Sequence, residues 1–135
     1  MSPTLLALLG LVCWALALLL LMELIRSKLV LTGAVAANGF DPANSTLSPF
    51  MQRLARAHAN CLEGLPIFGG LMVVAVLAGK TAVTDPLAYA LLGARLVQSV
   101  IHLASTAPAA VTARFAAFAV QLGIAVYWAW GLHAA

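Results

Sequence analysis

The segment from Thr4 to Met22 contains no charged residue and is long enough to cross a bilayer, which takes about 20 mostly apolar residues in a helix. Three further apolar stretches follow it, near residues 64–79, 86–105 and 109–132. Only 8% of the residues are charged, against about 25% in soluble domains, so the chain cannot cover a globule in water. The sequence therefore predicts an all-α integral membrane four-helix bundle forming a single domain over residues 1–135.

Proline and its neighbours predict where the helices begin. Ser48-Pro49 has a capping residue followed by proline at the first helical position, which predicts the start of the second helix. Asp85-Pro86 repeats this pattern, so we expect a short turn over residues 80–85 and a third helix from Pro86. Pro108 separates the third and fourth helices. The first segment has no basic residue before it and is longer than a signal-peptide core, so we expect it to be retained as a helix.

The distribution of basic residues predicts the orientation in the membrane. Arg26, Lys28 and Arg53 flank the first loop and Arg114 lies near the third, whereas the opposite side has only Lys80. By the positive-inside rule, loops one and three face the cytoplasm, and the Ala/Leu-rich composition favours a bacterial inner membrane. The basic residues are scattered, so we expect no nucleic-acid partner.

Some side chains invite a simpler interpretation. The two cysteines, Cys13 and Cys61, lie in apolar sequence without metal-ligand spacing, so we expect buried, inert thiols and no metal. The aromatic residues Tyr127, Trp128 and Trp130 near the C-terminus resemble an interfacial belt, with packing as the alternative. These residues carry no functional prediction.

Two of the predicted helices carry polar stripes that a membrane span should avoid. In the second helix, Arg56, Asn60 and Glu63 are spaced i, i+4, i+7, which places them on one face. In the third helix, Arg95, Ser99 and His102 repeat this spacing, with Gln98 on the same side. The pattern predicts a buried polar cluster where the second and third helices meet.

Arg95 is the most demanding residue, because a central arginine costs about 2.5–3.5 kcal/mol on membrane-insertion scales. Glu63 is the acid within a helix at comparable depth, so we expect it to pair with Arg95, within the chain or across a subunit boundary. The alternative is that this pair merely joins two helices. The wider cluster of guanidinium, amide and carboxylate groups suits a small ligand with carboxylates and an ammonium group.

The segment from Arg56 to Phe68 reads RAHANCLEGLPIF. It resembles the helix-two signature of the MAPEG family, the membrane-associated proteins in eicosanoid and glutathione metabolism. The shared pattern is Arg-Ala-His-x-Asn-x-x-Glu, followed by proline and an aromatic residue. The resemblance covers nearly the whole chain and implies a homotrimer that binds glutathione between subunits.

The resemblance also implies roles for individual residues. Arg56, Asn60 and Glu63 match glutathione contacts on helix two, and Arg95 and His102 match contacts on helix three. With Ser99 from the same stripe, these are the predicted glutathione-binding residues. Arg114 is similar to the arginine at the start of helix four that stabilises the glutathione thiolate, so it is the predicted catalytic residue.

Two functions follow from this comparison. The first is a glutathione-dependent membrane transferase or peroxidase that acts on a lipophilic electrophile or hydroperoxide taken from the membrane lipids. The second is a non-catalytic lipid-binding or partner-binding scaffold of the same fold. The second stays open because Ala36, Ala59 and Gln98 stand where related proteins have basic residues or histidine.

Overall fold

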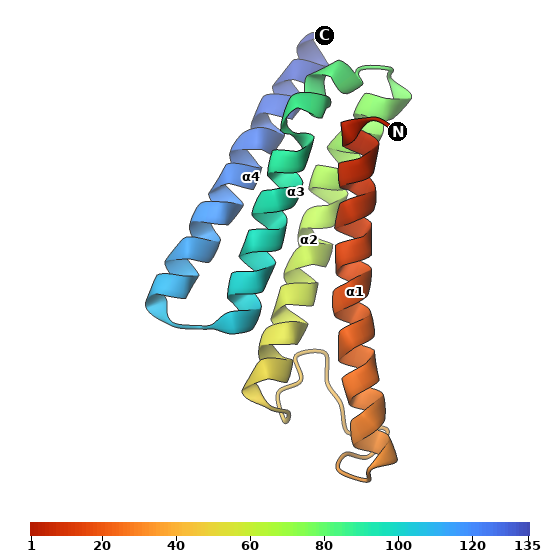
Figure 1. Ribbon diagram of the computed structural model, residues 1–135, viewed down its shortest axis with the longest axis vertical. Helices are drawn as coiled ribbons and strands as arrows, with labels where there is room; N and C mark the ends of the chain where they lie inside the picture. The colour runs from red at the N-terminus through yellow and green to blue at the C-terminus, as the bar shows by residue number, and fades with distance from the viewer.

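The computed structural model covers residues 1–135 and consists of four helices without strands. They are α1 (Pro3–Leu31), α2 (Pro49–Leu77), α3 (Thr81–Ala104) and α4 (Pro108–Ala134). Each helix is long and apolar enough to cross a membrane, which confirms the predicted all-α membrane bundle. Both termini and the α2–α3 turn lie at one end of the bundle, and the α1–α2 and α3–α4 loops lie at the other, here called the loop end (Figure 1).

Serine side chains cap the starts of α1 and α2, whereas α3 and α4 begin without a side-chain cap. The Ser48 hydroxyl accepts a hydrogen bond from the Met51 N–H at 3.2 Å, and Pro49 is the first residue of α2, as predicted. The predicted start of α3 at Pro86 is wrong, because α3 begins at Thr81 and Pro86 lies within its early turns. Pro86 is the sixth residue of α3, so its missing N–H removes only one helical hydrogen bond, near the start of the helix.

Asp85 has a different role from the predicted cap of its own helix. Its Oδ1 accepts hydrogen bonds from the Thr4 backbone N–H at 3.0 Å and from the Thr4 hydroxyl at 2.6 Å. The carboxylate thus satisfies a free N–H at the start of α1, where the helix dipole also favours a negative charge. This contact joins α1 to α3 at the end that carries both termini.

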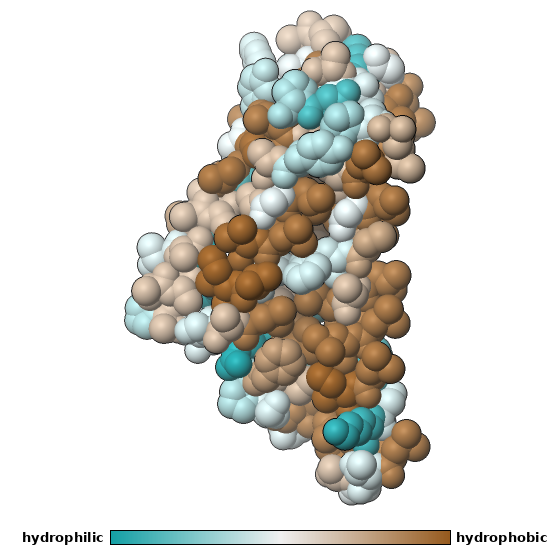
Figure 2. All heavy atoms as spheres, in the orientation of Figure 1, coloured by the Kyte–Doolittle hydropathy of each residue, from teal (hydrophilic) through white to brown (hydrophobic).

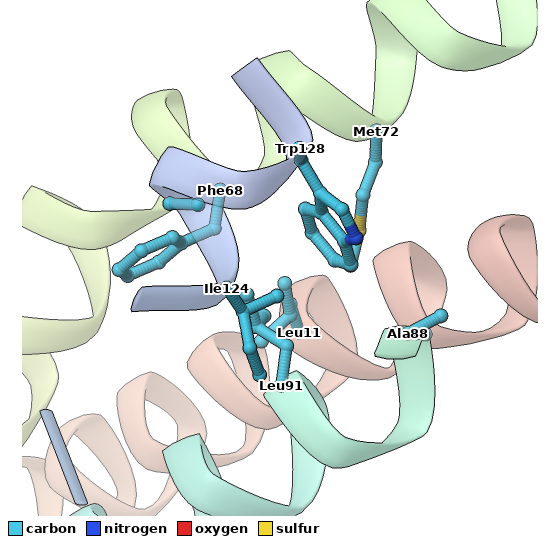
Figure 3. Packing of buried hydrophobic residues seen from close by; sticks show 9 residues of the cluster. Leu11, Phe68, Met72, Ala88, Leu91, Ile124 and Trp128 are labelled. Atoms are coloured by element: carbon cyan, nitrogen blue, oxygen red, sulfur yellow. The ribbon is translucent and has the colours of Figure 1, made fainter. Parts of the chain in front are cut away.

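All four helices meet in one apolar core (Figure 3). Its residues are Ala7, Leu11, Phe68, Met72, Ala88, Leu91, Ile124, Ala125 and Trp128. Trp128 is fully buried here, so the belt interpretation is wrong for this residue, whereas Tyr127 and Trp130 are 58% and 72% exposed. A second cluster joins α1 and α2 nearer the loop end, with Leu18, Met22 and Leu54 among its members.

The surface of the bundle is suited to lipid. Figure 2 shows hydrophobic residues over most of the visible face, with hydrophilic residues mainly toward its ends. Cys13 belongs to the exposed surface, so the expectation of two buried thiols holds only for Cys61. Apolar side chains, whose exposure to water would be unfavourable, can remain on the surface because lipid acyl chains surround them.

The long α1–α2 loop is tied to the helices by Asn44, which is fully buried. The Asn44 Nδ2 group donates to the Met51 carbonyl at 2.8 Å, and its Oδ1 accepts from the Arg26 Nε at 3.0 Å. Next to it, the Ser45 hydroxyl and backbone N–H donate to Asp41, which holds the pKa of that carboxyl below its usual range. These bonds fix the loop at the loop end, close to the start of α2.

Candidate functional site

Arg95 lies at the centre of the polar cluster and is only 2% exposed. Its Nη1 donates to the Asn60 Oδ1 at 2.5 Å, while its Nη2 is buried without a hydrogen-bond partner. The guanidinium carbon lies 5.6 Å from the centre of the Phe68 ring, which adds a cation–π contact. Gly64 makes room for this arrangement, because a Cβ atom at that position would lie 2.5 Å from the Arg95 Nη2.

The predicted Glu63–Arg95 pair does not form within the chain. The ion pair present joins Arg26 to Glu23 at 3.1 Å, and Glu63 is exposed. Glu63 follows Asn60 by three residues, which turns it by about 60° around α2 from the direction of Asn60. Asn60 therefore takes the place beside Arg95. Pairing of Glu63 with Arg95 across a subunit boundary stays a prediction.

Glu63 and Asn60 instead line a cavity of about 230 Å³ between α2 and α4. The other lining residues are Gly64, Ile67, Phe68, Phe118 and Leu122. We call this the polar cavity, because an amide and a carboxylate face it at one side. It lies beside the Arg95 guanidinium, which contacts Asn60 directly.

The rest of the predicted stripe continues toward the loop end. Ser99 is buried, and its hydroxyl lies 3.3 Å from the Cys61 sulfur. His102 is also buried, and both Arg56 and Arg114 lie close enough for their charges to act on its ring. Arg114 is half-buried, and its Nε has no hydrogen-bond partner. Three basic side chains from α2, α3 and α4 thus gather at this end of the cluster.

Two glutamines extend the cluster to α4. The Gln98 Nε2 donates to the Asn60 Oδ1 at 3.1 Å, and the Gln121 Nε2 donates to the Gln98 Oε1 at 2.8 Å. Gln98 lies on the predicted stripe, whereas the fully buried Gln121 was not among the predicted site residues. The signal was available, because Gln121 is a polar residue in the middle of an otherwise apolar span, the same criterion that selected Arg95.

An apolar groove of about 510 Å³ adjoins the polar cavity along α2 and α4. It is lined by Pro66, Ile67, Gly70, Leu71, Val74, Leu122, Ala125, Val126 and Ala129. Ile67 and Leu122 line both spaces, so the groove begins where the polar cavity ends. A molecule with a polar end and an apolar body could place its polar end in the polar cavity and its apolar body in the groove.

The MAPEG family model matches residues 4–134, nearly the whole chain. The chain belongs to the MAPEG family. No curated protein and no solved structure gives a significant match. Family membership supports a general role in glutathione-related or lipid metabolism, because members of the family generally use glutathione.

In this MAPEG chain the predicted site residues form two connected groups. Asn60 and Arg95 bond directly, with Glu63 on the adjoining cavity wall. Ser99 and His102 continue along α3 to Arg56 and Arg114. No group of three or more His, Cys, Asp or Glu side chains is arranged to hold a metal ion. Its guanidinium groups, which belong to Arg56, Arg95 and Arg114, suit the cluster to binding an anion and to stabilising negative charge.

Proposed function

We propose that this MAPEG protein is a glutathione-dependent membrane transferase or peroxidase that acts on a lipophilic electrophile or hydroperoxide. The observation that carries the proposal is the Arg95 guanidinium, which is buried, has no carboxylate partner within the chain and keeps one nitrogen without a hydrogen bond. A buried cation of this kind is costly unless it serves an anionic ligand or an ion pair.

The residues around Arg95 fit the chemistry of glutathione, which carries carboxylates, an ammonium group and a thiol. Arg95 and Arg56 supply guanidinium groups for carboxylates, which guanidinium binds in a two-pronged manner. Glu63, on the wall of the polar cavity, supplies a carboxylate for the ammonium group. The buried Ser99 hydroxyl and His102 ring add hydrogen-bonding groups along the same stripe.

Arg114 is the proposed catalytic residue. When bound, glutathione supplies the thiol, which reacts as the thiolate. A guanidinium favours the ionised form of a neighbouring thiol by electrostatic attraction, without transferring a proton itself. The Arg114 Nε is buried without a partner inside the chain, so its charge is available to an anion in the site.

The apolar groove supports a lipophilic second substrate. It lies along the membrane-spanning parts of α2 and α4 and adjoins the polar cavity through Ile67 and Leu122. A substrate dissolved in the bilayer can therefore reach the polar cavity without passing through water. The same groove favours the second candidate, a lipid-binding scaffold that holds such molecules without reacting with them.

We also propose a homotrimer whose subunits cover the polar face of α2. Arg56 and Glu63 are exposed on the outside of a single bundle, where charged groups facing lipid are costly. A neighbouring subunit over this face would shield both charges and enclose the ligand. We further propose that the loop end faces the cytoplasm of a bacterial cell, because its two loops are flanked by Arg26, Lys28, Arg53 and Arg114.

A titration of the detergent-purified protein with glutathione tests the function. Binding with new ultraviolet thiolate absorbance, together with conjugation of a chlorodinitrobenzene, supports the enzyme. Binding without thiolate absorbance or turnover supports the scaffold and contradicts the enzyme. Native mass spectrometry in mild detergent tests the trimer, which a clean monomer or dimer would contradict.

A further inference from the structure

A chain of side-chain hydrogen bonds crosses the bundle from α4 to α2. Gln121 donates from the same Nε2 to the Ala117 carbonyl at 3.1 Å and to the Gln98 Oε1 at 2.8 Å. Gln98 in turn donates to the Asn60 Oδ1 at 3.1 Å, and Arg95 donates to that same oxygen at 2.5 Å. Gln98 and Gln121 are 5% and 0% exposed, so these bonds form away from solvent.

The direction of this chain is determined at both of its ends. Arg95 has only donors, so the Asn60 atom that faces it must be the carbonyl oxygen. The Ala117 backbone carbonyl only accepts, so the Gln121 atom that faces it must be the nitrogen. Between these ends, Gln98 must direct its oxygen to Gln121 and its nitrogen to Asn60, since any reversal places two donors or two acceptors together.

We propose that Gln121 and Gln98 act as positioning residues that hold the Asn60 amide in one orientation, with its oxygen inward and its amino group toward the polar cavity. The Asn60 Nδ2 makes no hydrogen bond to any other residue of the protein, and Asn60 lines that cavity. Asn60 therefore presents donors only and selects a carboxylate or carbonyl oxygen of the ligand. This inference rests on the proposed function, in which the ligand is glutathione.

This orientation gives the two side chains in the cavity different ligand groups. Glu63 has only acceptors when ionised and is suited to an ammonium group, whereas the exposed Asn60 amino group cannot accept from an ammonium and donates to a ligand oxygen. A freely rotating amide would not discriminate between the two. Because the buried glutamines hold the Asn60 amide in one orientation, a ligand with an ammonium end and a carboxylate end binds in one orientation.

A contact that merely joins α3 to α4 would also bury Gln121, so the test must separate orientation from packing. Gln121→Met keeps the length of the side chain and removes both hydrogen bonds. We expect this variant to raise the Kd for glutathione about tenfold, the loss typical of one oriented hydrogen bond to a charged acceptor. The kcat at saturating glutathione should stay unchanged, because Gln121 does not contact the reacting atoms.

A double-mutant cycle with Asn60→Ala identifies the route of the effect. If Gln121 acts through Asn60, adding Gln121→Met to Asn60→Ala leaves the Kd unchanged. An additional tenfold loss in that background would overturn the proposal, and so would a wild-type Kd in the single variant. Gln52→Met is the matched control, because the Gln52 amide donates its hydrogen bonds to the carbonyls of Ser45 and Leu47 in the long loop and none to Asn60.

Side-chain hydrogen exchange of the protein without ligand keeps the two proposals distinguishable. With isotope-labelled amides, the Nε2 protons of Gln98 and Gln121 should exchange slowly, and the Nδ2 protons of Asn60 should exchange fast. Slow exchange at Asn60 and fast exchange at Gln98 would overturn the orientation even if glutathione binds. If the predicted exchange pattern is found but wild-type protein does not bind glutathione, the proposed function fails and the amide orientation stands.

Discussion

Gly64→Ala is the smallest change that reaches the centre of the site. The added Cβ would lie 2.5 Å from the Arg95 Nη2 and 2.9 Å from the Phe68 ring, and both distances are shorter than packed atoms tolerate. Arg95 has little freedom to move, because its other nitrogen is held by Asn60 at 2.5 Å and the residue is 2% exposed. The methyl group must therefore displace the guanidinium, the ring, or both.

The size of the effect follows from opposing terms. Alanine gains about 1 kcal/mol over glycine in helix propensity. Overpacking costs about 1–3 kcal/mol, and weakening a charged hydrogen bond such as the one between Arg95 and Asn60 costs about 1.5–3 kcal/mol. These terms sum to a net loss of about 1.5–5 kcal/mol in the free energy of unfolding, with weaker glutathione binding because the site residues have moved.

Thermal unfolding in detergent measures the first effect, and a glutathione titration measures the second. Gly93→Ala is the matched control, because Gly93 lies in α3 two residues from Arg95 and a Cβ there meets no atom within 4 Å. This control should gain stability from helix propensity. Equal melting temperatures for the two variants would refute the reasoning, because they would show that the space beside Arg95 is not limiting.

Three further predictions concern Asn60, Arg114 and Asp41. Asn60→Ala should destabilise the protein by about 1–3 kcal/mol in thermal unfolding, more than Glu63→Ala, because only Asn60 bonds to the buried Arg95; equal losses would contradict this ranking. Arg114→Ala should remain trimeric but lose thiolate absorbance and chlorodinitrobenzene conjugation, whereas wild-type turnover would show that Arg114 only anchors α4. The depressed pKa of Asp41 stabilises the loop above the usual aspartate pKa of about 3.9, and this contribution should disappear as pH falls through the lower pKa of the folded state. Limited proteolysis of the loop should therefore accelerate at acidic pH in wild type, and Asp41→Asn should be cleaved readily without this acid dependence.

Local patterns were sufficient to predict most of the architecture. The start of α2 was predicted correctly because Ser48 and Pro49 act on the backbone beside them. The start of α3 was predicted wrongly because Asp85 bonds to Thr4, 81 residues away, and no local pattern encodes such a contact. Trp128 was compared with an interfacial belt by its position near the end of the chain, yet its face of α4 turns into the core.

The sequence was sufficient to predict which residues belong to the candidate site, but not which of them contact one another. Arg95 stood out because the bilayer makes a central charge costly, and that cost is a property of the sequence and the solvent alone. Charge then favoured Glu63 as its partner. Within the chain the partner is Asn60, because the rotation of α2 directs the amide toward α3 and the carboxylate toward the polar cavity.

The sequence by itself determined four membrane helices, the capped start of α2 at Ser48 and the presence of a buried polar stripe, because hydropathy and capping depend on neighbouring residues. Tertiary structure decided which polar groups meet. Gln121 joins the cluster only because α4 packs beside α3. Glycine is needed at position 64 only because the Arg95 guanidinium occupies the space that a Cβ atom would take. Helix rotation and packing select among partners that spacing along one helix leaves equivalent, since hydrogen bonds depend on direction and distance between helices.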